Sequence, residues 1–209
     1  MTKICYSYLF GDKDVWRDPL PDNINHDWTY VLFTDQDIKS DVYEVKRVES
    51  VSNPQLASRH FKLLGAAQFY PEPFKKIFHH DANIRVNCDL DELPHFMIVN
   101  HPFHHCAYKE IELCKKLGKA NRSDLERARL MLREYRWNKD AGLYAAGLMM
   151  RPNTRAVDIF SFDWFHHAKW FTHRDQIFLP YLLDKHNMTP EIVEWSDLIG
   201  SKFLIHDHA

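Results

Sequence analysis

The sequence predicts a single α/β domain whose mainly parallel central sheet is flanked by helices. Apolar, strand-like runs alternate with amphipathic helical segments through the first half of the chain, which is typical of crossover connections between parallel strands. The length of 209 residues suits one α/β core. With 45% hydrophobic and 27% charged residues, the composition excludes disordered and fibrous proteins. We therefore expect residues 1–209 to form one domain.

The first two expected strands both end in polar residues. Residues 3–10 are rich in strand formers and end at Gly11, and residues 28–33 repeat this pattern before Thr34 and Asp35. Aromatic and β-branched side chains suit a half-buried pleated surface. These runs therefore predict two strands with polar carboxyl ends.

A helix and two further extended pieces are expected next. Asn53 suits an N-cap and Pro54 the first helical position, while Pro71 stops the helix. Residues 75–78 predict a short strand, and residues 84–86 predict a second extended segment.

The second half of the chain is mainly helical. Gly118 divides a long helical region, and residues 123–126 form a capping box that restarts it. Residues 148–150 indicate a buried strand. Apolar spacing predicts a helix over residues 154–171, and another is expected from residue 172 toward residue 186.

Charge and cysteine content narrow the functional classes. The net charge of −2 lacks the positive excess of proteins that bind nucleic acid or acidic membranes. The four cysteines form no C-x-x-C pair, so reduced core thiols are expected rather than disulfides or a zinc site. The first apolar run is too short for a signal peptide or a transmembrane segment. We therefore expect a cytoplasmic protein.

Ligands of open α/β sheets bind beyond the carboxyl ends of the strands. This rule predicts that residues 6–11, Thr34-Asp35 and Asp81-Ala82-Asn83 converge on one cleft. Asp81 and Asn83 are spaced i, i+2, so in an extended backbone their oxygens could face one hard divalent cation. The alternative is that both residues belong to a turn.

Four motifs occur in the chain in a characteristic order: Thr34-Asp35, Arg59 with Lys62, Asp81-Ala82-Asn83, and Arg174-Asp175-Gln176. Together they resemble the GT-A nucleotide-sugar glycosyltransferases. More narrowly, they are similar to a glycosyltransferase-like family of formerly unknown function, known from plant cell-wall and bacterial polysaccharide proteins. The resemblance covers most of the chain. It implies transfer of a sugar from a nucleotide-diphosphate donor to a glycan or other hydroxyl acceptor, with Mn²⁺ or Mg²⁺.

The resemblance also assigns site residues. The implied metal ligands are Asp81, Asn83, and His206 or His208, with Asn83 departing from the second acidic position of the family motif. The implied donor site comprises Tyr6, Thr34, Asp35, Arg59, Lys62, Asp81, Gly142 and Gly147. The alternative for Arg59 and Lys62 is that they are ordinary solvated charges on a helix. The alternative for Gly142 and Gly147 is that they are turn residues.

Asp175 has two interpretations. Residues 172–175 satisfy a capping box, in which Asp175 only stabilises a helix start. In the family's Arg-Asp-Gln motif, Asp175 would accept a proton from the acceptor hydroxyl or orient that hydroxyl.

Two other functions stay open. A metal-dependent hydrolase could use His80-Asp81 with residues 206–208, although the helical histidines usual in such sites are missing. The second open function is a catalytically silent module that binds a sugar nucleotide or a glycan. Asn83 favours it, because an amide in place of the second acidic residue weakens the metal motif.

Overall fold

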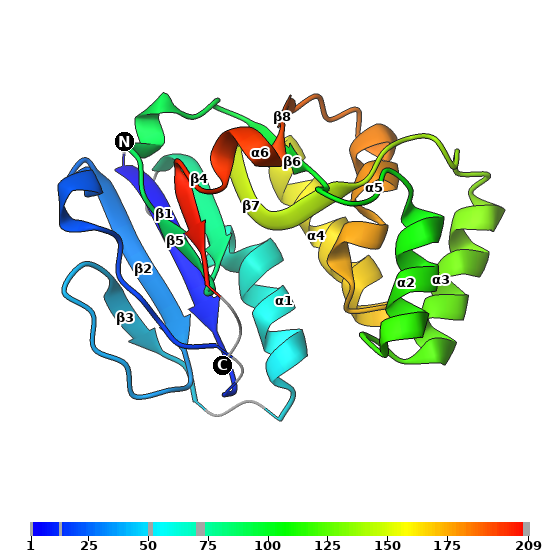
Figure 1. Cartoon of the computed structure of the whole chain (residues 1–209), viewed down its shortest axis with the longest axis horizontal. Helices are drawn as coiled ribbons and strands as arrows, with labels where there is room; N and C mark the ends of the chain where they lie inside the picture. Colours follow the sequence, from blue (N-terminus) through cyan, green and yellow to red (C-terminus); the bar gives the residue numbers. More distant parts are fainter. Residues whose placement is uncertain (1, 13, 50–51, 70–73, 207–209) are drawn as a thin grey trace.

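The computed structural model describes the chain except residues 1, 13, 50–51, 70–73 and 207–209. Its centre is a seven-stranded sheet in the order β3-β2-β1-β4-β7-β6-β8 (Figure 1). The strands are β1 (Thr2–Leu9), β2 (Trp28–Thr34), β3 (Glu44–Arg47), β4 (Phe74–Asp81), β6 (Met97–Asn100), β7 (Tyr144–Pro152) and β8 (Glu191–Val193). Only β7 runs antiparallel to its neighbours β4 and β6. The prediction of an α/β fold with a mostly parallel sheet is therefore confirmed.

The strand order reverses at the centre of the sheet. From β1 the chain moves outward to β2 and β3, and it then returns to place β4 on the other side of β1. Both neighbours pair with β1 in parallel, with Tyr8 opposite Phe33 of β2 and Asp81 of β4. The carboxyl ends of β1 and β4 therefore flank a topological switch point, where open α/β sheets bind ligands.

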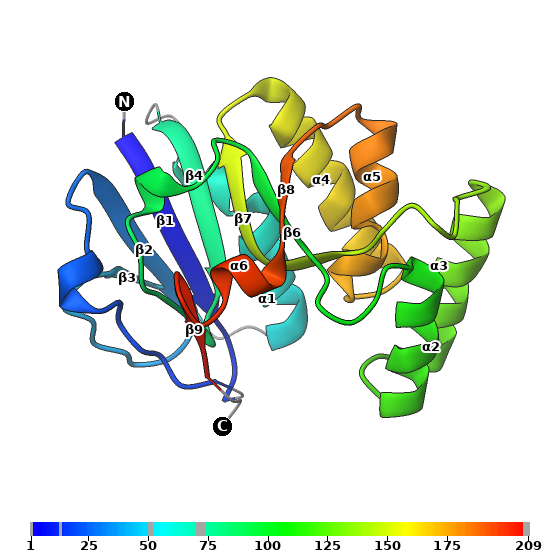
Figure 2. The same cartoon turned by 45° about the horizontal axis from the view of Figure 1, so that its top comes forward.

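Helices cover one face of the sheet. The α-helices on this face are α1 (Pro54–Leu64), α2 (Ala107–Leu117), α3 (Arg122–Glu134), α4 (Arg155–Trp170) and α5 (Leu179–Lys185). The short helix α6 (Trp195–Leu198) packs on the opposite face, where Leu198 joins the buried cluster that includes Phe78 and Phe203. Phe61 of α1 stacks on Phe33 of β2, and Trp164 of α4 belongs to one buried cluster with Met149 of β7. Figures 1 and 2 both show α2 and α3 as an adjacent pair on the far side of α5 from the sheet.

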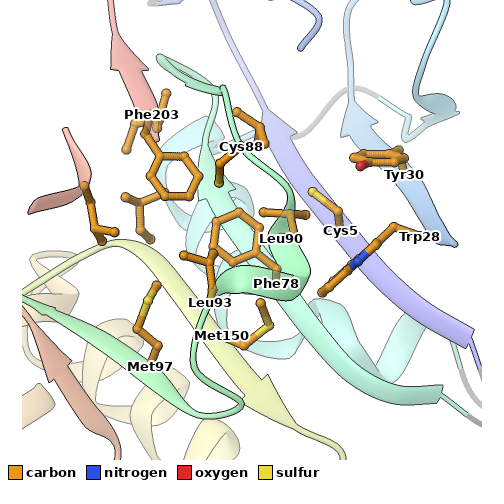
Figure 3. Packing of buried hydrophobic residues seen from close by; sticks show 14 of the residues in the cluster. Cys5, Trp28, Tyr30, Phe78, Cys88, Leu90, Leu93, Met97, Met150 and Phe203 are labelled. Atoms are coloured by element: carbon orange, nitrogen blue, oxygen red, sulfur yellow. The ribbon is translucent and has the colours of Figure 1, made fainter. Parts of the chain in front are cut away.

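A small second sheet covers the other face. β5 (Ile84–Val86) pairs antiparallel with β9 (Phe203–Ile205). Phe203 stacks on Phe78 of β4 at a ring-centroid distance of 5.6 Å, inside the cluster that includes Cys5 and Met150 (Figure 3). This packing fixes the turn between β4 and β5 against the main sheet.

Short 3-10 helices complete the described secondary structure. They are Pro21–Asn23, Gly65–Phe69, Leu90–Glu92 and Asp175–Ile177. All four cysteines are buried and free, as the sequence predicts. None of the helices within the described ranges has the length and apolar character needed to cross a bilayer.

Several helix boundaries follow local sequence rules. Asn53 caps α1 by accepting a hydrogen bond from the Leu56 amide, and Pro54 occupies the first turn, as predicted. The helix ends earlier than expected, at Leu64, and Pro71 lies outside the described residues. The break between α2 and α3 occurs at Gly118, whose φ of +63° is left-handed.

Two predicted helix starts are wrong. The N-cap of α3 is Asn121, whose side chain accepts from the Ser123 amide, and not Ser123 itself. The helix expected from Thr172 begins as α5 at Leu179, because Pro180 fits only the first helical turn. The sequence pattern also did not reveal β3, β6 and β8, which are short and have weak or no alternation.

Candidate functional site

Asp81 lies at the carboxyl end of β4, beside the switch point. The Tyr8 hydroxyl of neighbouring β1 donates a hydrogen bond to its Oδ1 atom. The Nζ atom of Lys62 lies 3.3 Å from the same oxygen. Both of these contacts are made by Oδ1. The Asp81 side chain remains 35% exposed, and within the described residues we find no hydrogen bond to its Oδ2 atom. Asp81 therefore combines a fixed carboxylate with an accessible oxygen.

Lys62 connects Asp81 to a second carboxylate. Its Nζ atom lies 2.8 Å from Oδ2 of Asp175, and the side chains of Lys62 and Asp175 are only 3% and 4% exposed. Arg59, one turn earlier on α1, places Nε 3.8 Å from Oδ1 of Asp175 and donates to the His173 carbonyl at 2.8 Å. Two cations and two carboxylates thus form one compact cluster, which we call the four-charge cluster.

The cluster holds Asp175 ionised. Burial acts to raise the pKa of Asp175, but the positive charges of Arg59 and Lys62 outweigh it and hold the pKa well below the usual range. The pKa of Arg59 is raised, because attraction to Asp175 and Asp81 exceeds the opposing effect of burial. The charged forms of Arg59 and Asp175 are therefore stabilised by their neighbours.

Arg151 of β7 positions the helix that carries both cations. Its guanidinium is buried and donates to the carbonyls of Lys62 and Leu63, at 3.0 Å each, in the last turn of α1. It also donates to the Tyr6 hydroxyl and to Ser161 of α4. These bonds satisfy carbonyls that the helix end leaves unpaired and join α1 to the sheet.

His79 of β4 extends this network from Arg151 to the carbonyl of Ala146, the residue before Gly147 on β7. Its Nδ1 atom lies 3.3 Å from an Arg151 nitrogen that can only donate, and its Nε2 atom lies 3.1 Å from the Ala146 carbonyl. Burial, followed by the charges of Arg151 and Lys62, lowers the pKa of His79 well below its usual value. His79 is therefore neutral, accepts at Nδ1 and donates at Nε2.

Gly147 follows Ala146 and allows close approach to Asp81. A Cβ atom at this position would lie 3.0 Å from Oδ2 of Asp81 and 3.2 Å from Cδ1 of Ile84. Any larger residue would therefore crowd the accessible oxygen of Asp81. The structure thus brings the predicted site residues Arg59, Lys62, Asp81, Gly147 and Asp175 together.

The remaining predicted donor-site residues have local structural contacts. The Tyr6 side chain is fully buried, and its hydroxyl donates to the Lys62 carbonyl. Thr34 is also buried and accepts from the Gln36 amide, while Asp35 accepts from the Gly11 amide at 3.2 Å. Tyr6 therefore supports the last turn of α1 and Thr34 supports the carboxyl end of β2, both from within the core. Gly142 lies in the segment before β7 with a φ of +88°.

The region after β4 is a turn, as the alternative interpretation holds. Residues 82 and 83 form it, so the extended spacing expected for Asp81 and Asn83 is wrong. Asn83 instead pairs with His206: its carbonyl accepts from the His206 amide at 2.9 Å, and its side chain donates to the His206 carbonyl. His208 lies outside the described residues.

The capping interpretation of Asp175 is also wrong. Thr172 Oγ1 accepts from the Arg174 amide rather than from Asp175, and no α-helix starts there. Asp175 Oδ1 accepts from the Gln176 amide instead. The carboxylate therefore turns inward to the cations of α1.

A neighbouring polar cluster was not predicted from the sequence. Buried Glu110 of α2 accepts from Arg174 at 3.1 Å and from Gln176 at 2.8 Å. Gln176 also lies 3.3 Å from His101 Nε2. Glu110 occupies a helix position that resembles any surface glutamate in sequence. Only its approach to the motif around Asp175 distinguishes it.

A surface pocket of about 290 Å³ lies elsewhere, among residues of the 24–44 region that include Trp28 and Glu44. These two residues begin β2 and β3, so the pocket is at the amino-terminal edge of the sheet. We assign the site to the opposite edge, because the buried charges and the strand reversal occur there.

Comparison with known proteins identifies the chain's family. Residues 90–196, just over half of the chain, match the family described as TOD1/MUCI70, glycosyltransferase-like domain. The match includes Glu110, Gly147 and Asp175, whereas Arg59, Lys62 and Asp81 precede it. No curated protein matches the chain. By this match, the chain belongs to the TOD1/MUCI70 glycosyltransferase-like domain family.

Proposed function

We propose that the chain is a GT-A-type glycosyltransferase that moves a sugar from a nucleotide-diphosphate donor to a hydroxyl acceptor. The observation that carries this proposal is the accessible carboxylate of Asp81, held beside Lys62 and Gly147 at the switch point of the sheet. Family membership supports glycosyl transfer in general. The open sheet with one reversed strand is compatible with the GT-A arrangement.

The donor's leaving group defines what the site must do. Departure of a nucleoside diphosphate builds negative charge, which preorganised positive groups stabilise best in a site with little water. Arg59 is the more exposed cation, with a side chain 17% exposed, so it is the candidate for direct contact with a phosphate. Gly147 leaves room for the donor beside Asp81.

A divalent cation fits this site through a small set of protein ligands. Magnesium sites in phosphate-transferring proteins use one or two carboxylates plus phosphate oxygens. Asp81 supplies such a carboxylate, Asn83 lies on the following turn, and His206, which follows β9, is hydrogen-bonded to Asn83. Within the described ranges, no group of three or more His, Cys, Asp or Glu residues could hold a metal by itself. Bound with the donor, Mg²⁺ or Mn²⁺ would neutralise charge on the leaving diphosphate.

Asp175 is proposed to act mainly by holding Arg59 and Lys62 in place. Its low pKa makes it a weak proton acceptor, since a general base works best with a pKa near the operating pH. The base role predicted from the family motif is tested directly by Asp175→Asn. A general base would lose about 100-fold or more in turnover with donor binding unchanged. A positioning residue would lose donor binding as well.

One assay distinguishes glycosyl transfer from donor hydrolysis and from binding without turnover. The protein is incubated with a panel of UDP- and GDP-sugars and Mn²⁺, with and without glycan acceptors, and released nucleoside diphosphate is measured. Acceptor-dependent release is expected. Acceptor-independent hydrolysis would indicate a hydrolase, and donor binding without turnover would indicate a binding module. His80 argues against a hydrolase, because it is buried and bonded to the Tyr43 hydroxyl at 2.8 Å.

The site itself is tested with Asp81→Asn. This variant should lose the Mn²⁺-dependent stabilisation by donor in thermal unfolding, because a ligand raises the stability of the state that binds it. The matched control is Asp124→Asn on α3, whose carboxylate pairs with Arg127 on the helix surface. Equal Mn²⁺-dependent stabilisation of Asp81→Asn and the parent would refute the assignment.

A further inference from the structure

Lys62 has an unusual place within the four-charge cluster. Its ammonium lies between Asp81 and Asp175, at 3.3 Å and 2.8 Å from their oxygens, and its side chain is 3% exposed. Its backbone carbonyl accepts from the Tyr6 hydroxyl at 2.6 Å and from Arg151 at 3.0 Å. These bonds fix the base of the side chain. The ammonium is therefore a positive charge held in a fixed position beside Asp81.

This charge opposes a cation that approaches Asp81 from solvent. Arg59, Lys62, Asp81 and Asp175 carry two positive and two negative charges, so the cluster as a whole has no negative excess. A divalent ion that uses the accessible oxygen of Asp81 would lie close to the Lys62 ammonium and be repelled by it. A bound diphosphate would supply the missing negative charge.

We propose that Lys62 is an internal counter-ion that makes divalent-cation binding at Asp81 depend on a diphosphate. The cation and the diphosphate then bind cooperatively, and neither is held firmly alone. This inference rests on the proposed function only in taking Asp81 as the cation's carboxylate ligand. It adds that a residue on α1 determines when that ligand is available.

The experiment uses Mn²⁺ alone, inorganic pyrophosphate alone and both together, with binding followed by calorimetry and thermal unfolding. The parent should be stabilised clearly only by the two together. Lys62→Met should bind Mn²⁺ alone at least about tenfold more tightly than the parent, because it removes the opposing charge. The control Arg174→Gln removes a positive charge near Asp175 that pairs with Glu110, and it should change Mn²⁺ affinity less than threefold.

A second variant keeps the inference testable if Lys62→Met alone fails to fold. Lys62→Met alone leaves Asp175 buried without its nearest cation, so Lys62→Met/Asp175→Asn removes both charges together. It should also bind Mn²⁺ alone more tightly than the parent. Mn²⁺ affinity in both variants equal to or below that of the parent would overturn the inference. So would strong binding of Mn²⁺ alone by the parent.

The role of Asp81 is checked separately in Lys62→Met/Asp81→Asn, which should lose the gained affinity. If this variant keeps it, Asp81 is not the ligand, and the metal site of the proposed function fails together with the inference. If the parent binds Mn²⁺ through Asp81 without pyrophosphate, only the inference about Lys62 fails.

Discussion

Asp175→Asn should destabilise the protein through its ion pairs. Asparagine keeps the size of the side chain and the oxygen that accepts from Gln176, so the change removes mainly the charge. That charge is 4% exposed and lies 2.8 Å from Lys62 and 3.8 Å from Arg59. Removal of one partner of a buried pair costs about 3–5 kcal/mol, and we expect about 3 because Lys62 keeps Asp81.

A double-mutant cycle with Lys62→Met measures the interaction. Lys62→Met alone should also cost about 3 kcal/mol, because Asp175 then loses its nearest cation. The double variant should cost about 2 kcal/mol rather than about 6, since replacing a buried pair by neutral groups is often nearly neutral. The free energies come from urea unfolding at pH 7, where the loss of 3 kcal/mol lowers the midpoint by about 1–2 M.

The pH dependence gives an independent check. Because folding lowers the pKa of Asp175, the carboxylate contributes stability above its unfolded pKa of about 3.9 and loses it as the pH falls toward the folded value. The stability difference between the parent and Asp175→Asn should therefore be constant from pH 7 to about 5 and shrink below about 4. Additive single effects, or an Asp175→Asn cost below about 0.5 kcal/mol, would refute this account of the cluster.

Three further outcomes are expected. Arg151→Met should cost at least about 3 kcal/mol in urea unfolding, because it leaves buried carbonyls in the last turn of α1 unpaired; a cost below about 1 would contradict the positioning role. Gly65→Ala should cost about 1–3 kcal/mol, because its Cβ would lie 2.5 Å from a Tyr6 ring carbon, whereas Tyr6→Leu should relieve that added cost. Burial lowers the pKa of His80 to about 4, so its neutral form favours folding above about pH 6.5, and this contribution is lost as the pH falls from about 6.5 toward 4. NMR should show a neutral His80 imidazole at pH 5, and a titration near 6.5 would contradict the burial argument.

Local rules in the sequence determined much of the fold. Alternating strand and helix patterns predict the α/β class, and the order of polar strand ends predicts the edge of the sheet at which Asp81 lies. Asn53, Pro54 and Gly118 mark helix boundaries because their effects act through the nearest backbone groups. Short strands such as β6 and β8 could not be predicted, because tertiary packing rather than local propensity stabilises them.

The tertiary structure alone decided how the candidate site is built. In sequence, Lys62 and Arg59 are two cations one helical turn apart, which a solvated helix face would also show. Asp175 fits a capping box equally well. Only the packing of α1 against α4 and β1, which brings Lys62 beside Asp81 of β4 and beside the segment after α4, buries these charges together. Burial makes their pairing strong enough to shift the pKa of Asp175. Contacts between residues more than a hundred positions apart, such as Lys62 with Asp175, leave no local pattern in the sequence.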